Sequence, residues 1–161
     1  MNYKIYTDGA TSGNGYEGAQ GGWAFVAIDE NEKIILEGCG HINNTTNNIC
    51  ELTAIIKACE TAEKMINKDE KVIVYSDSAY AINGLNDWIC TWRHNNWQTS
   101  KRQPIKNQEL WKRLLLFVDD SRFSFEKVKG HNVDKTPDTY WNNYVDRLAV
   151  EAKVSNLEES D

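Results

Sequence analysis

The sequence predicts a single α/β domain with a mixed five-stranded sheet, three antiparallel strands followed by two parallel ones, and helices on both faces. Three strand-like runs with short connections (2–8, 22–28 and 33–38) are typical of an antiparallel meander. A full helical pattern then precedes the next strand (71–75), which must run parallel to the first if it lies beside it. Finally, 161 residues with 40% hydrophobic content support one core and are short for two.

The remaining elements follow from local patterns. Alternation around Ile5 indicates a half-buried first strand, and a glycine-rich turn follows it over 8–15. Polar residues at 45–48 precede a helix whose apolar stripe runs from Ile49 to Ile66. The later elements are a short helix ending near Gly84, a tryptophan-rich helix (86–95), a basic loop, a helix (106–119), a strand (122–129) and a last helix (139–153). We expect the domain to span 1–154, with 155–161 as a flexible acidic tail.

Composition argues against membrane and disulfide-rich classes. No apolar run approaches the roughly 20 residues that span a bilayer, and the first residues do not resemble a signal peptide. Four cysteines without C-x-x-C spacing favour buried free thiols over disulfides or a zinc site. We therefore expect a cytoplasmic protein without membrane contact. A monomer is the default expectation, because no large apolar stripe is left over.

Charge is unevenly distributed along the chain. The net charge is -6, yet the segment 88–113 carries +5 and leaves -11 for the rest. Four tryptophans lie within this segment, namely Trp88, Trp92, Trp97 and Trp111. A local basic patch matters more for nucleic-acid binding than the net charge of the whole chain.

Four carboxylates are the candidate chemical groups, and each also has an ordinary structural explanation. Asp8 could be a simple strand-to-turn residue, and Glu51 could serve the first turn of its helix as a capping-box acid. Asp77, between two serines, could be a helix N-cap. Asp146 lies beside the buried stripe of the last helix and could form a solvated pair with Arg147.

These four explanations become improbable together. Parallel strands would bring Asp8 and Asp77 to one edge of the sheet, near the start of the helix that carries Glu51. Like charges raise one another's pKa, so acids this close need cations to stay ionised. Oxygen ligands without cysteine favour Mg²⁺, or Mn²⁺ as a substitute, over zinc. Two such ions about 4 Å apart can activate water and stabilise a leaving oxygen in phosphodiester cleavage.

Five segments in register over nearly the whole chain resemble type 1 ribonuclease H. They are Tyr6-Thr7-Asp8-Gly9, Thr45-Thr46-Asn47-Asn48-x-x-Glu51-Leu52, Ser76-Asp77-Ser78, Lys129-Gly130-His131 and Asn142-x-x-x-Asp146. The resemblance implies the ribonuclease H-like fold. It also implies endonucleolytic hydrolysis of RNA paired to DNA, leaving 3′-hydroxyl and 5′-phosphate ends.

The resemblance assigns a role to each catalytic candidate. It implies that Asp8 bridges two metal ions and that Asp146 helps to hold the ion that activates water. Glu51 and Asp77 would hold the ion that stabilises the leaving 3′-oxygen. His131 would correspond to the family's mobile histidine, which shuttles protons or helps the product to leave.

Substrate contacts are expected in two regions. Recognition of RNA requires contact with 2′-hydroxyls in the minor groove, and short polar groups could supply this contact. For Asn14 and Asn48, a role in a turn or a helix cap is the alternative. The tryptophan-rich basic segment resembles the basic protrusion of some family members and could bind the DNA strand. Alternatively, one of Trp88 and Trp92 could belong to the hydrophobic core, and a core position is more readily assigned to Trp111. The candidates are Gly9, Ala10, Thr11, Asn14, Thr46, Asn47, Asn48, Trp88, Trp92, Thr99, Lys101, Arg102, Lys106 and Asn142.

Three departures from the family pattern affect details. Ala79 stands where many bacterial relatives have a glutamine, the glycine-rich turn is longer, and so is the segment from His131 to Asp146. Two alternatives to catalysis are an inactive hybrid-binding module of the same fold and a structural calcium site. The first predicts loss of an acid, whereas all four are present; the second leaves the basic tryptophan-rich segment unexplained.

Overall fold

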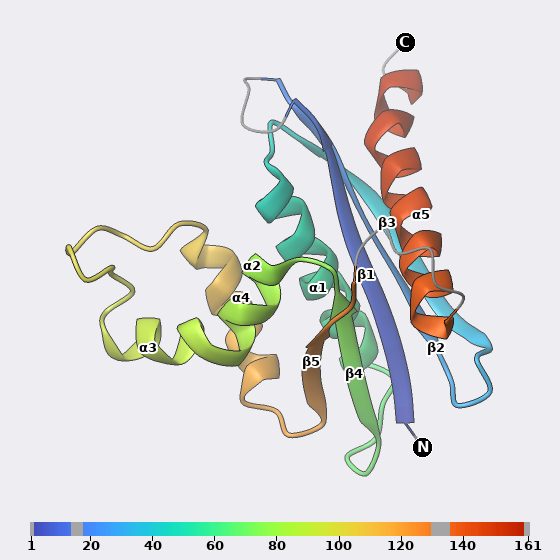
Figure 1. Cartoon of the computed structure of the whole chain (residues 1–161), viewed down its shortest axis with the longest axis horizontal. Coiled ribbons are helices and arrows are strands. Elements are labelled where there is room, and N and C mark those ends of the chain that lie inside the picture. The colour runs from blue at the N-terminus through green and yellow to red at the C-terminus, as the bar shows by residue number, and fades with distance from the viewer. Residues whose placement is uncertain (1, 14–17, 130–135, 160–161) are drawn as a thin grey trace.

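The computed structural model describes residues 2–13, 18–129 and 136–159. Five strands form one sheet in the order β3-β2-β1-β4-β5 (Figure 1). β1 (Asn2–Ser12), β2 (Gln20–Ile28) and β3 (Ile34–Asn43) are antiparallel, whereas β4 (Lys71–Ser76) and β5 (Phe123–Lys127) add in parallel. α1 (Asn47–Glu63) covers one face and α5 (Pro137–Glu159) the other. The predicted fold class is confirmed.

β1 differs from the expectation in two ways. The strand runs on through Ser12, so Asp8 lies inside it, and 9–12 are not turn residues. Gly9 to Ser12 pair with β2, a partner that local sequence does not reveal. The strand is also not half-buried, because Ile5, Tyr6 and Thr7 are each 1% exposed. A central strand with a helix on each face is buried on both.

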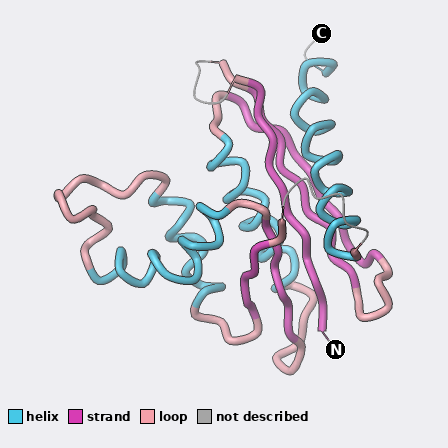
Figure 2. The backbone as a smooth tube through the Cα atoms, viewed as in Figure 1, coloured by secondary structure: helices cyan, strands magenta, loops and turns pink. Residues whose placement is uncertain are grey.

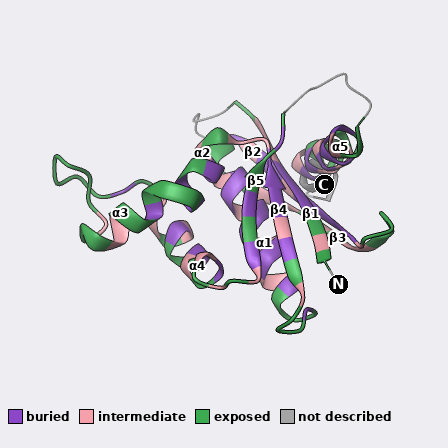
Figure 3. Ribbon diagram, turned by 60° about the horizontal axis from the view of Figure 1, so that its bottom comes forward, coloured by how far each residue is buried: buried purple, intermediate pink, exposed green. Residues whose placement is uncertain are grey.

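Each face of the sheet has its own hydrophobic core. Ile5 and Phe25 belong to the core under α1, whereas Tyr6 and Val26 belong to the core under α5, as the two-residue period of a strand requires. Figure 3 shows buried residues along the strands between α1 and α5, and exposed ones on the outer loops.

Gly21 and Gly22 allow both helices to approach β2 closely. A Cβ on Gly21 would lie 2.4 Å from Cys50 Sγ, next to the start of α1. A Cβ on Gly22 would lie 2.3 Å from the carbonyl oxygen of Ala149 in α5. Neighbouring positions point to opposite faces, so this glycine pair brings α1 and α5 close on both sides.

The short helix ends next to Gly84, as predicted, but the chain stays helical beyond that point. α2 (Ala79–Asn83), the π-helical turn η1 (Gly84–Trp88) and α3 (Ile89–His94) follow one another without a break. Gly84 has right-handed helical angles, with φ -61° and ψ -47°, rather than those of a terminating glycine. Its missing side chain makes room for Trp111, whose ring would lie 2.1 Å from a Cβ at this position.

A long loop follows α3 and leads into α4 (Gln108–Val118). Figure 2 shows this loop extending away from the sheet. Ile105 is buried and anchors the loop through a 3.0 Å hydrogen bond from its N–H to the Trp97 carbonyl oxygen. Trp111 is completely buried, as expected.

The remaining expectations have mixed outcomes. α1 ends at Glu63, so Ile66 reaches the core from the following segment instead of from the helix. All four cysteines are free, but only Cys50 and Cys59 are buried; Cys39 and Cys90 are exposed. α5 begins at Pro137 and runs to Glu159, past the expected end at 153. No helix in the described ranges is long and apolar enough to span a membrane.

Candidate active site

Asp8 lies where β1 separates from β4. The parallel pairing of these strands reaches Tyr6 and Tyr75, and the Thr7 hydroxyl donates a 2.8 Å hydrogen bond to the Tyr75 carbonyl oxygen. β4 then ends at Ser76, and the next residue is Asp77. This register places Asp77 beside Asp8, which is only 3% exposed.

Glu51 is held at the same place by backbone and side-chain donors. The Gly9 N–H donates to its Oε1 at 2.7 Å, and the Ser76 hydroxyl donates to its Oε2 at 3.1 Å. A Cβ on Gly9 would lie 2.6 Å from the carbonyl carbon of Cys50, so this close contact between β1 and α1 requires glycine.

The capping explanations for two of the acids are wrong. Thr46 is the N-cap of α1 and accepts a hydrogen bond from the Ile49 N–H, whereas Glu51 faces β1. Ser78, not Asp77, caps α2 and accepts from the Ala81 N–H. Neither acid therefore caps a helix, and both lie in the cluster.

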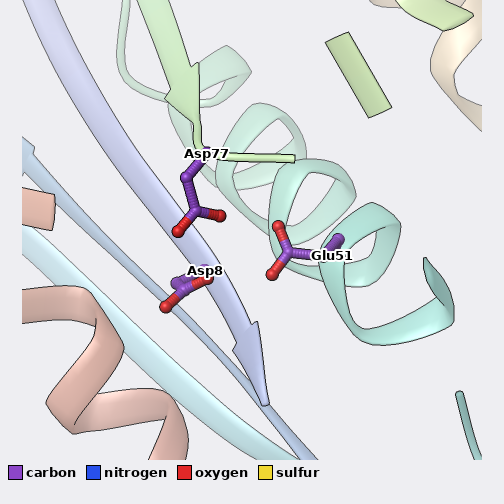
Figure 4. A group of neighbouring side chains, drawn as sticks. All are labelled: Asp8, Glu51 and Asp77. Atoms are coloured by element: carbon purple, nitrogen blue, oxygen red, sulfur yellow. The ribbon is translucent and has the colours of Figure 1, made fainter. Parts of the chain in front are cut away.

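Carboxylate oxygens of Asp8, Glu51 and Asp77 lie within 4.8 Å of one another. Figure 4 shows the three side chains pointing toward a common space between β1, α1 and the end of β4. Three acids that are distant in sequence thus converge at one edge of the sheet, as the parallel-strand argument predicted.

Burial and mutual repulsion oppose ionisation of this cluster. Burial, followed by the charge of Glu51, raises the pKa of Asp8 far above its ordinary value. Burial likewise raises the pKa of Glu51 to about 7, against the hydrogen bonds it accepts. Without a cation, burial and mutual repulsion therefore favour proton uptake by this cluster.

Asp146 reaches the cluster from α5. It is half-buried and close enough to Asp8 to help raise the pKa of that acid, but it is not one of the three acids whose oxygens lie within 4.8 Å of one another. One turn earlier, Asn142 is 3% exposed, and its Oδ1 has no hydrogen-bond partner among the described residues. A buried carbonyl oxygen without a partner costs free energy, so this position favours a ligand that supplies one.

The donor set fits a hard divalent cation. Clustered carboxylates are the oxygen ligands that Mg²⁺ and Mn²⁺ prefer. A cation would also relieve the repulsion that raises the pKa values of Asp8 and Glu51.

We expect stability to depend on pH through this cluster. Glu51 binds its proton more tightly in the folded chain than at its ordinary value of 4.5, so its contribution to stability is complete below about pH 4.5 and is lost as pH rises through about 7. Melting temperatures in EDTA should fall over this window, and millimolar Mg²⁺ at pH 7.5 should restore them by binding the folded state. The melting temperature of Glu51→Gln should fall less over this window and should rise less on addition of Mg²⁺. A Glu51→Gln variant that matches the parent chain in both respects would contradict the assignment.

The predicted minor-groove contacts lie near the acids, at the start of α1 and the end of β1. The Thr11 hydroxyl hydrogen-bonds to Asn47 Oδ1, which joins these two segments. The Gly9 N–H already donates to Glu51, and the Thr46 hydroxyl already accepts the capping hydrogen bond. Asn48 is exposed, and Ala10 is partly exposed. Asn14 and His131 lie outside the described residues.

The predicted DNA-strand contacts lie on η1, α3 and the loop after α3. Trp88 is 37% exposed, and its ring centroid lies 5.9 Å from that of Trp92. Trp92 is half-buried, with its centroid 5.1 Å from that of Trp111. The Thr99 hydroxyl accepts from two backbone N–H groups and so shapes the loop. The loop's basic side chains, Lys101, Arg102 and Lys106, are exposed.

Ser76 is a site residue that the sequence pattern did not predict. Its side chain is completely buried and links Glu51 to the Ser78 N–H, with which it forms a 3.1 Å hydrogen bond. The available signal was its position directly before Asp77 at the end of a strand.

Comparisons with known proteins agree with this architecture. The RNase H family model matches residues 1–154. A ribonuclease H from Caldicellulosiruptor saccharolyticus is 43% identical over 146 residues, which cover 90% of this chain and 91% of the relative. The structure of LC9-RNase H1, described as a type 1 RNase H with the type 2 active-site motif, aligns with a TM-score of 0.78 and 25% identity, covering 94% of this chain and 72% of the other.

A viral structure shows the same fold within a larger protein. The foamy viral protease-reverse transcriptase in complex with an RNA/DNA hybrid aligns with a TM-score of 0.80 and 20% identity, covering 94% of this chain and 20% of the viral one. The predicted resemblance is confirmed by the family model and by the bacterial relative. The chain therefore belongs to the ribonuclease H family, as a type 1 enzyme of the bacterial kind.

Proposed function

We propose that this chain is an endonuclease that hydrolyses the RNA strand of RNA/DNA hybrids with two divalent metal ions, leaving 5′-phosphate and 3′-hydroxyl ends. The convergence of Asp8, Glu51 and Asp77, with ligand oxygens within 4.8 Å, carries this proposal. Membership of a metal-dependent nuclease family and the complex of its viral relative with a hybrid support it.

Each acid has a distinct place in the proposed reaction. Asp8 is central, because it contacts Asp146 on one side and lies against Glu51 and Asp77 on the other. Asp8 and Asp146 would orient the attacking water, while Glu51 and Asp77 would face the leaving 3′-oxygen. Mg²⁺, or Mn²⁺ in its place, would lower the pKa of the water and offset charge that develops on the phosphate. The role of His131 as a proton carrier stays a prediction.

Hybrid recognition is proposed to use both polar and aromatic surfaces. Thr11, Asn47 and Asn48 lie next to the acids and are suited to contact 2′-hydroxyl groups of the RNA strand. The exposed Trp88 and the basic loop that begins after α3 are suited to the DNA strand, through ring contact with sugars and charge contact with phosphates.

Trp88→Ala should weaken hybrid binding without disturbing the acids. The ring is partly exposed and far less embedded than that of Trp92, so its removal should cost roughly 1 kcal/mol of binding, about fivefold in Kd. Binding can be measured by fluorescence anisotropy with a labelled hybrid in Ca²⁺. Tyr140→Ala, which removes an exposed aromatic ring from α5, is the matched control and should leave Kd unchanged. Equal Kd values for both variants would remove Trp88 from the interface.

The test of function is cleavage of one end-labelled sequence as RNA/DNA, RNA/RNA, DNA/DNA and single-stranded RNA, each with Mg²⁺, Mn²⁺ or EDTA. We expect cutting of RNA in the hybrid alone, stopped by EDTA, with 5′-phosphate and 3′-hydroxyl ends. Tight hybrid binding without cutting in either metal would instead indicate a binding module. A monomer in the cytoplasm remains part of the proposal, and sedimentation with and without hybrid tests the monomer.

A further inference from the structure

A partly buried hydrogen bond joins β1 to the first turn of α5. The Tyr6 hydroxyl donates to Asp138 Oδ1, across 132 residues of sequence. Tyr6 is 1% exposed, and its ring stacks on Tyr75 with centroids 4.8 Å apart and on Trp141 with centroids 6.5 Å apart. The bond therefore lies inside the interface between the sheet and α5.

The hydroxyl itself requires an explanation. A phenylalanine would make the same two ring stacks, and a buried hydroxyl costs free energy unless it is hydrogen-bonded. A tyrosine hydroxyl keeps its proton at neutral pH, so it can donate to Asp138. The Tyr6 hydroxyl therefore has Asp138 as the hydrogen-bond partner that its burial requires.

The same strand and the same helix carry two of the active-site acids. Tyr6 and Asp8 are two residues apart on β1, so their side chains point to the same face of the sheet. Asp138 and Asp146 are two turns apart on α5, a rise of about 12 Å. The Tyr6–Asp138 and Asp8–Asp146 contacts are therefore neighbouring links between one strand and one helix.

α5 is fixed to the sheet on either side of Asp146. Before it, Trp141 Nε1 donates to Glu32 at 3.4 Å, in addition to the Tyr6 bond. After it, the backbone of α5 lies against Gly22, and His41 Nδ1 bonds to the Ala152 carbonyl oxygen at 3.1 Å. The distance between Asp146 and β1 depends on these attachments. Among them, the hydrogen bond from Tyr6 is the one made to β1, the strand that carries Asp8.

We propose that Tyr6 and Asp138 are positioning residues that hold Asp146 against Asp8 and thereby set the affinity of the acid cluster for divalent cations. Neither residue needs to touch the metal or the substrate. This inference rests on the proposed function of the cluster as a metal site. It assigns to the start of α5 a role in catalysis beyond helix stability.

The test compares Tyr6→Phe, Asp138→Ala and Asp138→Asn with the parent chain. Tyr6→Phe and Asp138→Ala each break the bond, whereas Asp138→Asn keeps an oxygen that can accept it. Two quantities are measured: the Mg²⁺ concentration for half-maximal cleavage, and the Mn²⁺ concentration for half of the metal-induced rise in Tm without substrate. We expect Tyr6→Phe and Asp138→Ala to raise both by roughly 10-fold, the lower end of effects seen for residues that orient metal ligands.

Two comparisons separate positioning from general destabilisation. Tyr3→Phe removes a similar bond on the same strand, from Tyr3 to Glu70 at 2.8 Å, on the face of the sheet opposite to α5, and should leave both metal concentrations unchanged. The double variant Tyr6→Phe/Asp138→Ala should be no worse than either single variant, because both lose one interaction.

Several outcomes would overturn the inference. Unchanged metal dependence in Tyr6→Phe would do so, as would an equal change in Tyr3→Phe or a loss in Asp138→Asn as large as in Asp138→Ala. Failure of the proposed function would look different, since the parent chain would then not cleave hybrids. The substrate-free Mn²⁺ titration would still report whether the bond sets metal affinity.

Discussion

Asp8→Asn is expected to slow hybrid cleavage on the order of 10³-fold or more, equivalent to about 4 kcal/mol of transition-state stabilisation. Asp8 is the acid that contacts both halves of the cluster, so an amide there removes the shared negative charge while preserving shape. Single-turnover cleavage at saturating enzyme isolates this effect from substrate binding, which we expect to persist in anisotropy measurements.

In the absence of metal, the same variant should be more stable than the parent chain. Burial and the charge of Glu51 oppose ionisation of Asp8 in the folded chain, whereas Asp8 is ionised in the unfolded chain at neutral pH, and an amide removes this cost of folding. For a chain of this size, each kcal/mol gained corresponds to roughly 2–4 °C in Tm. Asp69→Asn, an exposed acid outside the cluster, is the matched control and should change neither rate nor Tm. Near-parental turnover of Asp8→Asn would refute the site.

Gly9→Ala should impair both stability and catalysis. The added Cβ would lie 2.6 Å from the carbonyl carbon of Cys50 and 2.7 Å from the Glu51 nitrogen, so α1 must move away from β1. We expect a loss of about 1–3 kcal/mol in the free energy of unfolding, as for other overpacked interiors. Displacement of Glu51 from the Gly9 N–H should slow cleavage on the order of 10²-fold, as loss of a ligand's supporting contact does.

Urea unfolding and single-turnover cleavage check the two parts of this prediction. Ser12→Ala, at an exposed position further along β1, provides the comparison and should resemble the parent chain. Parental stability together with parental cleavage in Gly9→Ala would show that the contact between β1 and α1 does not hold Glu51 in place.

The sheet and three of the acids were predictable because they depend on connection lengths. A helix between two neighbouring strands makes them parallel, and that rule alone places Asp8 beside Asp77. The position of Glu51 near the start of α1 then brings it to the same edge. These inferences use only the order of elements along the chain.

The remaining features depend on contacts between distant segments. Gly9 appeared to open a turn, because its pairing with Trp23 and its contact with Cys50 cannot be seen locally. Gly84 resembled a helix stop for the same reason, although its role is to accommodate Trp111. The bond from Tyr6 to Asp138 spans most of the chain, and no local pattern indicates it.

The two separate cores have a consequence for partly unfolded forms of the enzyme. The core under α5 is the smaller cluster and is divided by the sheet from the core under α1. A native-state opening that detaches α5 alone removes Asp146 but leaves Asp8, Glu51 and Asp77 on the rest of the domain. Such an opened form retains the convergent acids and lacks the fourth. Hydrogen exchange in α5 therefore measures the free energy that separates the complete active site from one with three acids.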